Sequence, residues 1–251
     1  MRLLTASVDA PDLGTTELEA AYAIAADLPW HVRTSFICSA DGAVSLDGSS
    51  MPLGGPGDRR LFGLLRDLSD LVLVGAGTAR AERYRVPRPV VDRLDRRRRH
   101  GLPDAPALAV VSSRLDLDPA DELFSTGRPI LITHQGAPVE RRLALARVAD
   151  VLVSGLESVD LRGAAAQLRE RGYRRVHCEG GPRLFRAALA AEVVHELCLT
   201  LAPLLTGPGA ERIVTGSPLP AARRMSLVHT LTEDGYLFLR YALTGAAEAT
   251  G

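Results

Sequence analysis

The sequence contains no lysine, so all 30 of its basic residues are arginines, and 30 acidic residues balance them. Without lysine the chain cannot form a Schiff base with a substrate and cannot supply the lysine of a phosphate-binding P-loop. The formal net charge of +0 provides no overall field that would attract a polyanion. We therefore expect neither a nucleic-acid-binding protein nor a membrane-surface protein.

Cysteine and long apolar runs are also scarce. The three cysteines, Cys38, Cys178 and Cys198, are widely spaced, form no C-x-x-C pair, and each lies in an apolar run. This pattern predicts buried free thiols in a reducing compartment. No apolar run approaches the roughly 20 residues of a membrane span, and the N-terminus lacks the pattern of a signal peptide. We expect a cytoplasmic protein.

Signatures of metal and nucleophile chemistry are missing as well. The histidines lack the spacing of a zinc site, and no G-x-S-x-G motif is present, so we expect no metal and no activated serine. His177 and His195 are expected to lie at strand edges and not to act as general bases. A chain without metal, nucleophile or lysine favours a cofactor that carries the chemistry itself, such as a nicotinamide that donates a hydride.

The hydrophobic pattern alternates between short apolar runs and helical stretches over most of the chain. Strands are predicted at 30–38, 71–74, 107–111, 129–133, 151–153, 175–178 and 196–201, and helices at about 17–26, 58–68, 138–147, 160–171 and from 182. Two further strands, at about 225–232 and 236–243, predict an antiparallel hairpin. This order predicts a three-layer α/β fold whose mostly parallel sheet ends in antiparallel C-terminal strands. Residues 1–29 are predicted as an N-terminal extension and residues 30–251 as a single domain.

Two segments between these elements are predicted to be loops. Residues 49–57 are rich in glycine and proline, and Asp58 is expected to cap the helix that follows. Residues 84–106 contain several prolines and the run Arg96–Arg99, and we expect this run to be a solvated part of an exposed loop.

The stretch Glu179-Gly180-Gly181-Pro182 stands between a predicted strand and a predicted helix. Proline suits the first turn of a helix, and glycine lets the backbone approach a ligand closely. The N–H groups and the dipole at a helix start favour a phosphate, so Gly180 and Gly181 are candidates for holding a pyrophosphate. A phosphate in direct contact would repel a carboxylate, so Glu179 is expected to face a substrate beside the phosphate-bearing ligand.

Two other predicted strands end in polar or glycine-rich turns, and ligands of open parallel sheets bind outside the carboxyl ends of the strands. Thr78, in the turn after 71–74, would donate its hydroxyl to the same pyrophosphate. Ser112, Ser113 and Arg114 would meet an adenosine 2′-phosphate, because arginine binds phosphate bidentately. The glycines after 71–74 do not complete a dinucleotide fingerprint, since Arg80 takes the place of the third glycine, and each is more often a plain turn residue.

Four stretches together resemble a known family: SADG at 39–42, LLRDLSDLVLVGAGTARAERYR at 64–85, VVSSRLDL at 110–117 and CEGGPRLFRAALAAEVVHELCLTLAPLLTG at 178–207. They resemble the C-terminal reductase domain of the bifunctional riboflavin-biosynthesis deaminase/reductase, and more closely the stand-alone actinobacterial pyrimidine reductases. The resemblance extends from about residue 30 to residue 243. It implies a dihydrofolate-reductase-like fold, NADPH as the cofactor and a homodimer. The H-x-E and P-C-x-x-C motifs of the zinc deaminase half do not occur in this sequence.

The same resemblance assigns residues to the two ligands. It implies cofactor contacts at Ile37, Thr78, Glu82, Ser112 and the helix start Gly181, Pro182, Arg183, Leu184 and Phe185, continuing to Ala187. It implies substrate contacts at Asp41, Arg66, Arg85 and Glu179, although the helical pattern alone places Arg66 on a solvated face. The ribityl-forming relatives carry Ser-x-Trp in the loop before the helix predicted at 58–68. This chain has Met51-Pro52-Leu53 there, and the difference bears on the identity of the substrate.

The mechanism that follows from the resemblance is transfer of a hydride from NADPH to C1′ of a ring-opened ribosylamino-pyrimidine phosphate. Arg85 or Arg66 would hold the substrate phosphate. Glu179 and Asp41 would orient the pyrimidine or the sugar, and either of them would relay a proton. Two alternatives stay open: reduction of dihydrofolate, with Asp41 on the pterin edge and Arg66 on a glutamate carboxylate, and a non-catalytic nucleotide-binding sensor.

Overall fold

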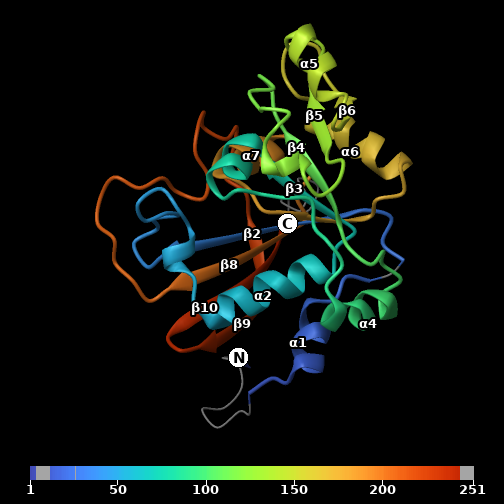
Figure 1. Cartoon of the computed structure of the whole chain (residues 1–251). Helices are drawn as coiled ribbons and strands as arrows, with labels where there is room; N and C mark the ends of the chain where they lie inside the picture. The colour runs from blue at the N-terminus through green and yellow to red at the C-terminus, as the bar shows by residue number, and fades with distance from the viewer. Residues whose placement is uncertain (4–11, 26, 244–251) are drawn as a thin grey trace.

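The computed structural model describes residues 1–3, 12–25 and 27–243 (Figure 1). Ten strands of this part form one sheet in the order β1-β9-β10-β8-β2-β7-β3-β4-β5-β6. They are β1 (Arg2–Leu3), β2 (His31–Ser39), β3 (Leu71–Gly75), β4 (Ala107–Val111), β5 (Ile130–Thr133), β6 (Asp150–Val153), β7 (Arg175–Cys178), β8 (Glu196–Ala202), β9 (Met225–Glu233) and β10 (Tyr236–Leu243). From β8 through β6 neighbouring strands are parallel, whereas β10, β9 and β1 pair antiparallel. The predicted sheet is confirmed.

Helices cover both faces of the sheet. They are α1 (Thr15–Tyr22), α2 (Pro56–Asp67), α3 (Ala76–Ala81), α4 (Val91–Arg99), α5 (Val139–Leu145), α6 (Leu161–Glu170) and α7 (Pro182–Ala190). Successive strand residues point to opposite faces, so Leu73 packs with α6 and α7 while Val72 and Val74 pack with α3 and α5. A third cluster joins α1 and α2 to β8, β9 and β10. Figure 1 shows α1, α2 and α4 grouped at the lower end of the molecule.

Helix α2 begins earlier than predicted. Gly55 is its N-cap and Pro56 its first residue, so the prediction that Asp58 caps the helix is wrong. Proline fits this place because its missing N–H would have no partner there. Asp58 instead lies in the first turn, where its side chain is free to face the cavity described below. The preceding loop contains a single 3-10 turn, Met51–Leu53.

The arginine run is a second error of the sequence prediction. Arg96–Arg99 ends helix α4 rather than lying in a loop, and Arg97 is only 2% exposed. Its Nη1 donates to the carbonyl oxygens of Arg66, Asp67 and Ser69, at 2.9, 3.2 and 3.0 Å. The carbonyl of Arg66 also accepts hydrogen bonds from the hydroxyl and the N–H of Ser69. Carbonyls at the end of a helix cannot all be satisfied within it, so the buried guanidinium completes their hydrogen bonding.

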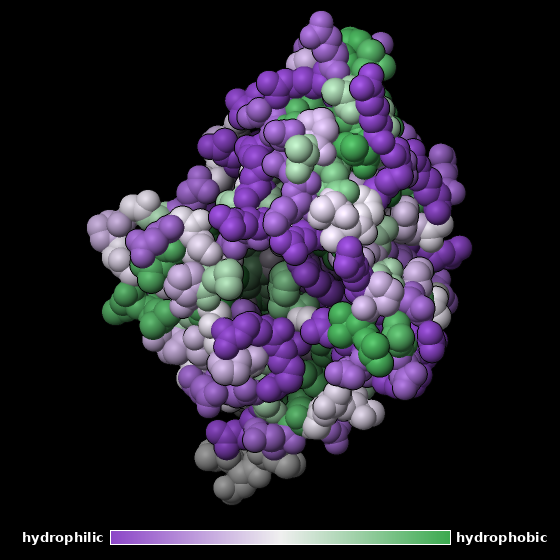
Figure 2. Space-filling model, in the orientation of Figure 1, coloured by the Kyte–Doolittle hydropathy of each residue, from purple (hydrophilic) through white to green (hydrophobic). Residues whose placement is uncertain are grey.

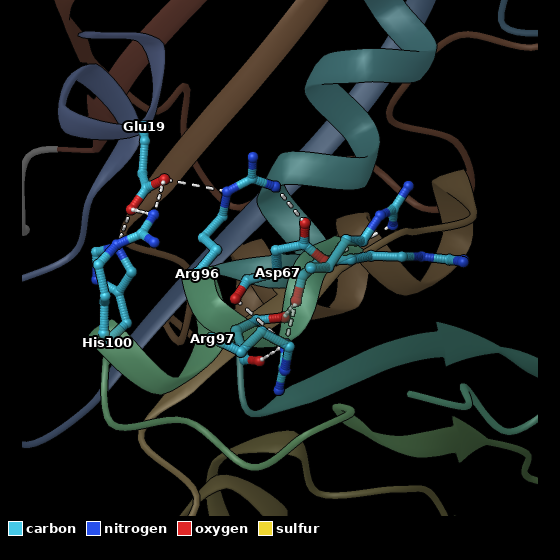
Figure 3. Close-up of polar contacts among 9 residues, drawn as sticks. Glu19, Asp67, Arg96, Arg97 and His100 are labelled. Atoms are coloured by element: carbon cyan, nitrogen blue, oxygen red, sulfur yellow. Dashed lines mark hydrogen bonds and ion pairs between the residues drawn. The ribbon is translucent and has the colours of Figure 1, made fainter. Parts of the chain in front are cut away.

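Arg96 connects the N-terminal segment to α2 (Figure 3). It donates to Glu19 of α1 at 3.1 Å and to Asp67 of α2 at 2.6 Å, and His100 lies 2.8 Å from Glu19. Burial alone would raise the pKa of Glu19, but the hydrogen bonds from His100 and the arginines hold it below its usual value. Glu19 therefore remains a carboxylate that fixes α1 against α4.

The described part of residues 1–29 packs on the domain. Arg2–Leu3 pairs with β9, and Tyr22 is fully buried. The predicted helix at 17–26 is observed at Thr15–Tyr22, and its last predicted residue, 26, lies outside the described residues. Residues 4–11 and 244–251 lie outside them as well, and the division of the chain at residue 30 stays a prediction.

The three cysteines are buried free thiols, as predicted. Burial raises the pKa of Cys178 to about 11, so this thiol stays protonated. Among the described residues no helix is both long and apolar enough to cross a membrane.

Candidate functional site

A cavity of about 430 Å³ lies between α2 and the sheet, beside the carboxyl ends of β2, β3 and β7. Figure 2 shows a hollow near the centre of this face, with hydrophobic side chains inside it and a hydrophilic rim. Parallel strands bring their carboxyl ends to one edge, which is why turns far apart in sequence meet here. Seven of the predicted site residues line the cavity: Ile37, Arg66, Thr78, Glu82, Glu179, Gly181 and Pro182.

Arg66 and Glu179 form a bidentate ion pair in the cavity wall. Nε of Arg66 donates to Oε1 of Glu179 at 2.6 Å, and Nη2 donates to Oε2 at 2.7 Å. The hydroxyl of Tyr84 also donates to Oε2, at 2.5 Å. The Glu179 side chain is 1% exposed and that of Arg66 is 32% exposed, so the arginine keeps a surface toward the cavity. The helix position of Arg66 thus serves this pair and not a solvated face.

The charges of this group are fixed by their contacts. Burial would raise the pKa of Glu179, but the hydrogen bonds and charge of Arg66 hold it below its usual value. Burial, followed by the negative charge of Glu179, raises the pKa of Tyr84 well above its usual value. At neutral pH Glu179 is therefore a carboxylate and Tyr84 a neutral hydrogen-bond donor.

Close packing requires glycine at both positions after Glu179. Gly180 has a φ of +75°, and a Cβ there would lie 2.7 Å from the ring of Phe36. A Cβ on Gly181 would lie 2.5 Å from the hydroxyl oxygen of Thr78. The N–H of Gly75 donates to the carbonyl of Gly180 at 2.7 Å, so the turn is tied to the end of β3. The peptide bond between the two glycines is cis.

Helix α7 begins at Pro182, as predicted, and Gly181 is its N-cap. The side chains of its first turn differ in burial. Leu184 and Phe185 are buried in the core, and Phe185 packs against Phe36 with ring centroids 5.1 Å apart. Arg183 is exposed. A ligand at this helix start would therefore meet backbone N–H groups and not the side chains of Leu184 and Phe185.

The turn after β4 lies at the same sheet edge but does not line the cavity. Ser112 is buried, and its hydroxyl accepts a hydrogen bond from the N–H of Leu115 at 3.0 Å. Ser113 and Arg114 are exposed. Their predicted contact with a 2′-phosphate stays a prediction.

Glu82 fixes the loop that covers the cavity. Its carboxylate accepts hydrogen bonds from the N–H of Ser50 at 3.1 Å, from the hydroxyl of Ser50 at 3.2 Å and from the hydroxyl of Ser49 at 3.3 Å. Glu82 thus holds the loop before α2 against α3.

Two predicted substrate residues are not among those that line the cavity. Asp41 accepts hydrogen bonds from the backbone N–H groups of Gly207, at 2.8 Å, and Thr206, at 3.2 Å. The hydroxyl of Ser39 and the N–H of Gly207 lower its pKa to about 2. Arg85 is exposed and forms an ion pair with Glu122 at 2.6 Å. The contacts of Asp41 and Arg85 with substrate stay predictions.

Sequence reasoning missed several polar residues of the site. Asp58 lines the cavity; burial raises its pKa, and the hydrogen bond with Thr200 opposes this. Ser35 also lines the cavity, two residues before Ile37 on the same face of β2. His177 is 1% exposed within β7, a central strand, so the prediction that it lies at a strand edge is wrong. The period of two along β2 is the one sequence signal that could have identified Ser35.

Among the described residues no three or more His, Cys, Asp or Glu side chains are grouped as ligands of a metal ion would be. The site is built instead from a carboxylate–arginine pair, a tyrosine and a glycine turn at a helix start.

The chain is similar in sequence and in fold to known proteins. A 2,5-diamino-6-ribosylamino-4(3H)-pyrimidinone 5′-phosphate reductase of Methanothermobacter thermautotrophicus is 29% identical over 211 residues, which is 82% of this chain and 94% of that protein. A pyrimidine reductase-like protein of Corynebacterium diphtheriae superposes with a TM-score of 0.81 at 28% identity, covering 91% of this chain and 98% of the other. The riboflavin biosynthesis reductase Rib7 of Saccharomyces cerevisiae, at 19% identity, shares the fold with a TM-score of 0.64 over 90% of this chain and 95% of its own.

The family comparison covers the elements that build the cavity. Residues 30–237 match the model of the RibD C-terminal domain, a range that includes β2, α2, the Glu179 turn and α7. The chain belongs to the RibD C-terminal domain family.

Proposed function

We propose that this protein is an NADPH-dependent reductase that transfers a hydride to a ribosylamino-pyrimidine phosphate. One observation carries the proposal: a glycine turn at the start of α7 and the Arg66–Glu179 pair line the same cavity. The first suits a pyrophosphate-bearing cofactor, and the second is a polar wall for a substrate beside it. The names of the relatives support this reaction class.

The residues present fit a nicotinamide dinucleotide. A Cβ at Gly181 would lie 2.5 Å from the Thr78 hydroxyl oxygen, so glycine lets this hydroxyl pack directly against the backbone at the start of α7. The backbone N–H groups and this hydroxyl together form a polar cradle. Phosphate at a helix N-terminus is stabilised by free N–H groups and the helix dipole. Ser113 and Arg114, exposed at the adjacent sheet edge, would distinguish NADPH from NADH. When bound, the cofactor supplies the hydride.

The chain's own residues position the substrate. Arg59 and Arg66 are the two arginines that line the cavity among the described residues, and either would attract the substrate phosphate. Glu179 has both oxygens engaged, so its first task is to hold Arg66 and Tyr84 in place. Precise placement of two reactants contributes about 7–11 kcal/mol to catalysis. A proton relay through Glu179 or Asp41, a homodimer and a cytoplasmic location stay predictions.

Asp58 also suits a second candidate reaction, the reduction of dihydrofolate. Its carboxylate is largely buried in the cavity next to Thr200. Two oxygens of a carboxylate match the ring N–H and amino donors of a pterin, which an aminopyrimidine also presents. Asp58, and not Asp41, lines the cavity for this contact.

Steady-state oxidation of NADPH tests the proposal directly. We expect turnover with the aminopyrimidine ribosyl phosphate and a lower kcat/KM with dihydrofolate. A reversed order would favour dihydrofolate as the substrate. Tight NADPH binding without turnover of either compound would contradict a reductase.

A further inference from the structure

Three side chains are in contact at the cavity wall, with His177 of β7 between Ser35 of β2 and Glu179 at the end of β7. The hydroxyl of Ser35 lies 2.7 Å from Nε2 of His177, and Nδ1 of His177 lies 3.3 Å from Oε1 of Glu179. Ser35 and Glu179 line the cavity, whereas His177 is buried behind them. The ring of Phe62 packs edge-on against the imidazole, with centroids 5.6 Å apart.

The surroundings of His177 decide which ring nitrogen carries the proton. Burial lowers its pKa to about 4, so the imidazole is neutral at pH 7 and has one N–H and one acceptor nitrogen. Arg66 keeps Glu179 ionised, and a carboxylate only accepts hydrogen bonds. A lone pair on Nδ1 would face this negative charge at 3.3 Å, so Nδ1 carries the proton and Nε2 is the acceptor.

This tautomer sets the polarity of Ser35. A serine hydroxyl has one hydrogen to donate and two lone pairs to accept. Nε2 takes the hydrogen at 2.7 Å, so Ser35 offers the cavity only lone pairs. The opposite tautomer would reverse this, since Nε2–H would donate to Ser35 and the serine hydrogen would point to the ligand.

We propose that Ser35 is a specificity-determining residue that accepts a hydrogen bond from an N–H or O–H group of the substrate, and that His177 is the positioning residue that sets this polarity through Glu179. The inference rests on the proposed function, because it takes the ligand beside Ser35 to be the substrate. It selects substrates that present a donor there, such as the amino group of an aminopyrimidine or a sugar hydroxyl. A carbonyl or phosphate oxygen at this place would face the lone pairs of Ser35 and be rejected.

Nitrogen NMR of the wild-type protein tests the tautomer without any substrate. In protein labelled with ¹⁵N-histidine, we expect His177 to show a protonated Nδ1 and an unprotonated Nε2, assigned by comparison with the His177→Gln variant. In Glu179→Gln the preference for this tautomer should weaken, since the negative charge is gone. A protonated Nε2 in the wild type would overturn the inference.

Kinetics with the aminopyrimidine ribosyl phosphate tests the contact. Ser35→Ala leaves a substrate donor without its acceptor, and we expect KM to rise about 10- to 100-fold with little change in kcat. The matched control is Thr34→Val, which removes a hydroxyl from the neighbouring residue of β2 on the opposite face of the sheet. This control should change KM less than about twofold.

Variants of His177 separate positioning from folding. His177→Gln keeps an acceptor oxygen for Ser35, so KM should stay near the wild-type value. His177→Leu frees the serine hydroxyl to rotate while leaving its lone pairs, so it should raise KM, but less than Ser35→Ala does. The double variant with both Ser35→Ala and His177→Leu should be no worse than Ser35→Ala alone, because His177 then has no hydroxyl to orient. Equal KM for Ser35→Ala and the wild type would overturn the inference. No turnover by the wild type would instead defeat the proposed function, and the NMR result would still decide the tautomer.

Discussion

Arg66 and Glu179 bind each other through two parallel hydrogen bonds of 2.6 and 2.7 Å, although both were predicted to bind substrate. They come from separate elements, the end of α2 and the turn after β7. The pair therefore joins the helix layer to the sheet at the cavity. Glu179 fixes the position of the Arg66 guanidinium, and the exposed part of that guanidinium faces the cavity. The ion pair therefore links the positioning of Arg66 to its proposed contact with substrate.

Removal of one partner of this pair should destabilise the protein. Arg66→Ala leaves the buried Glu179 carboxylate without its main partner, and we expect a loss of about 2–4 kcal/mol in the free energy of unfolding. Arg66→Lys should recover only part of this, since lysine cannot form the bidentate contact. Urea unfolding measures both. If Arg66→Ala changed the free energy of unfolding by less than about 0.5 kcal/mol, as an ordinary surface substitution does, the pair would not hold the layers together.

Gly181 and Gly77 offer a matched comparison for the cofactor cradle. Gly181→Ala places a Cβ 2.5 Å from the Thr78 hydroxyl, so we expect NADPH affinity to fall about tenfold or more. Gly77→Ala meets no atom within 4 Å and lies in α3, so it should leave NADPH affinity unchanged. Isothermal titration with NADPH gives both values. Equal affinities for the two variants would show that the cradle formed by Gly181 and Thr78 does not bind the cofactor.

Cofactor choice should depend on Arg114. Arg114→Ala should weaken NADPH by about tenfold and NADH hardly at all, because only NADPH carries the 2′-phosphate. The control is Arg169→Ala, an exposed arginine of α6 away from the cavity. Equal losses for both nucleotides, measured by fluorescence titration, would refute the assignment of Arg114.

Sequence reasoning identified the sheet and the turns at its edge because these depend on local patterns. The apolar runs marked the strands, and Gly181-Pro182 marked the start of α7. The errors concern long-range contacts. Nothing near Arg97 in the sequence shows that α2 ends beside it, and the pattern around His177 does not show that Ser35 and Glu179 surround it. Asp58 was misplaced because Gly55 and Pro56 start the helix earlier.

Arg97 should be worth far more to stability than its neighbour Arg98. Arg97→Ala removes a buried donor shared by three carbonyls, of which, within the described part of the chain, only that of Arg66 keeps another hydrogen bond, from Ser69, and we expect a loss of about 2–4 kcal/mol. Arg98 is exposed and pairs with the exposed Asp104. Arg98→Ala should change the free energy of unfolding by less than about 1 kcal/mol. Thermal unfolding of both variants measures the difference. Similar losses of stability for Arg97→Ala and Arg98→Ala would show that Arg97 behaves as a solvated surface residue.

Stability should fall as the pH drops from 6.5 toward 4, the range between the ordinary pKa of histidine and the value of about 4 for His177. In this range the unfolded chain binds a proton at His177 that the folded chain does not, so the free energy of unfolding rises with pH. The contribution of His177 to stability reaches its full value above the ordinary pKa of histidine. The slope is at most about 1.4 kcal/mol per pH unit for one histidine. His229, with a pKa lowered to about 4 by burial, adds to it.

His177→Gln should therefore have a shallower pH dependence than the wild type. Urea unfolding at pH 7 and pH 5 measures the two slopes, and both pH values lie above the range in which Glu179 and Glu196 lose their charge. Identical slopes would show that folding leaves the pKa of His177 at its ordinary value.

Transfer of isotope from the cofactor tests the central claim most directly. NADPH deuterated at both C4 positions should be incubated with the protein and the aminopyrimidine ribosyl phosphate, and the product analysed by mass spectrometry. The account predicts one deuterium at the sugar carbon C1′ of the ribitylamino product. A product without deuterium, or deuterium only in recovered NADPH, would contradict it.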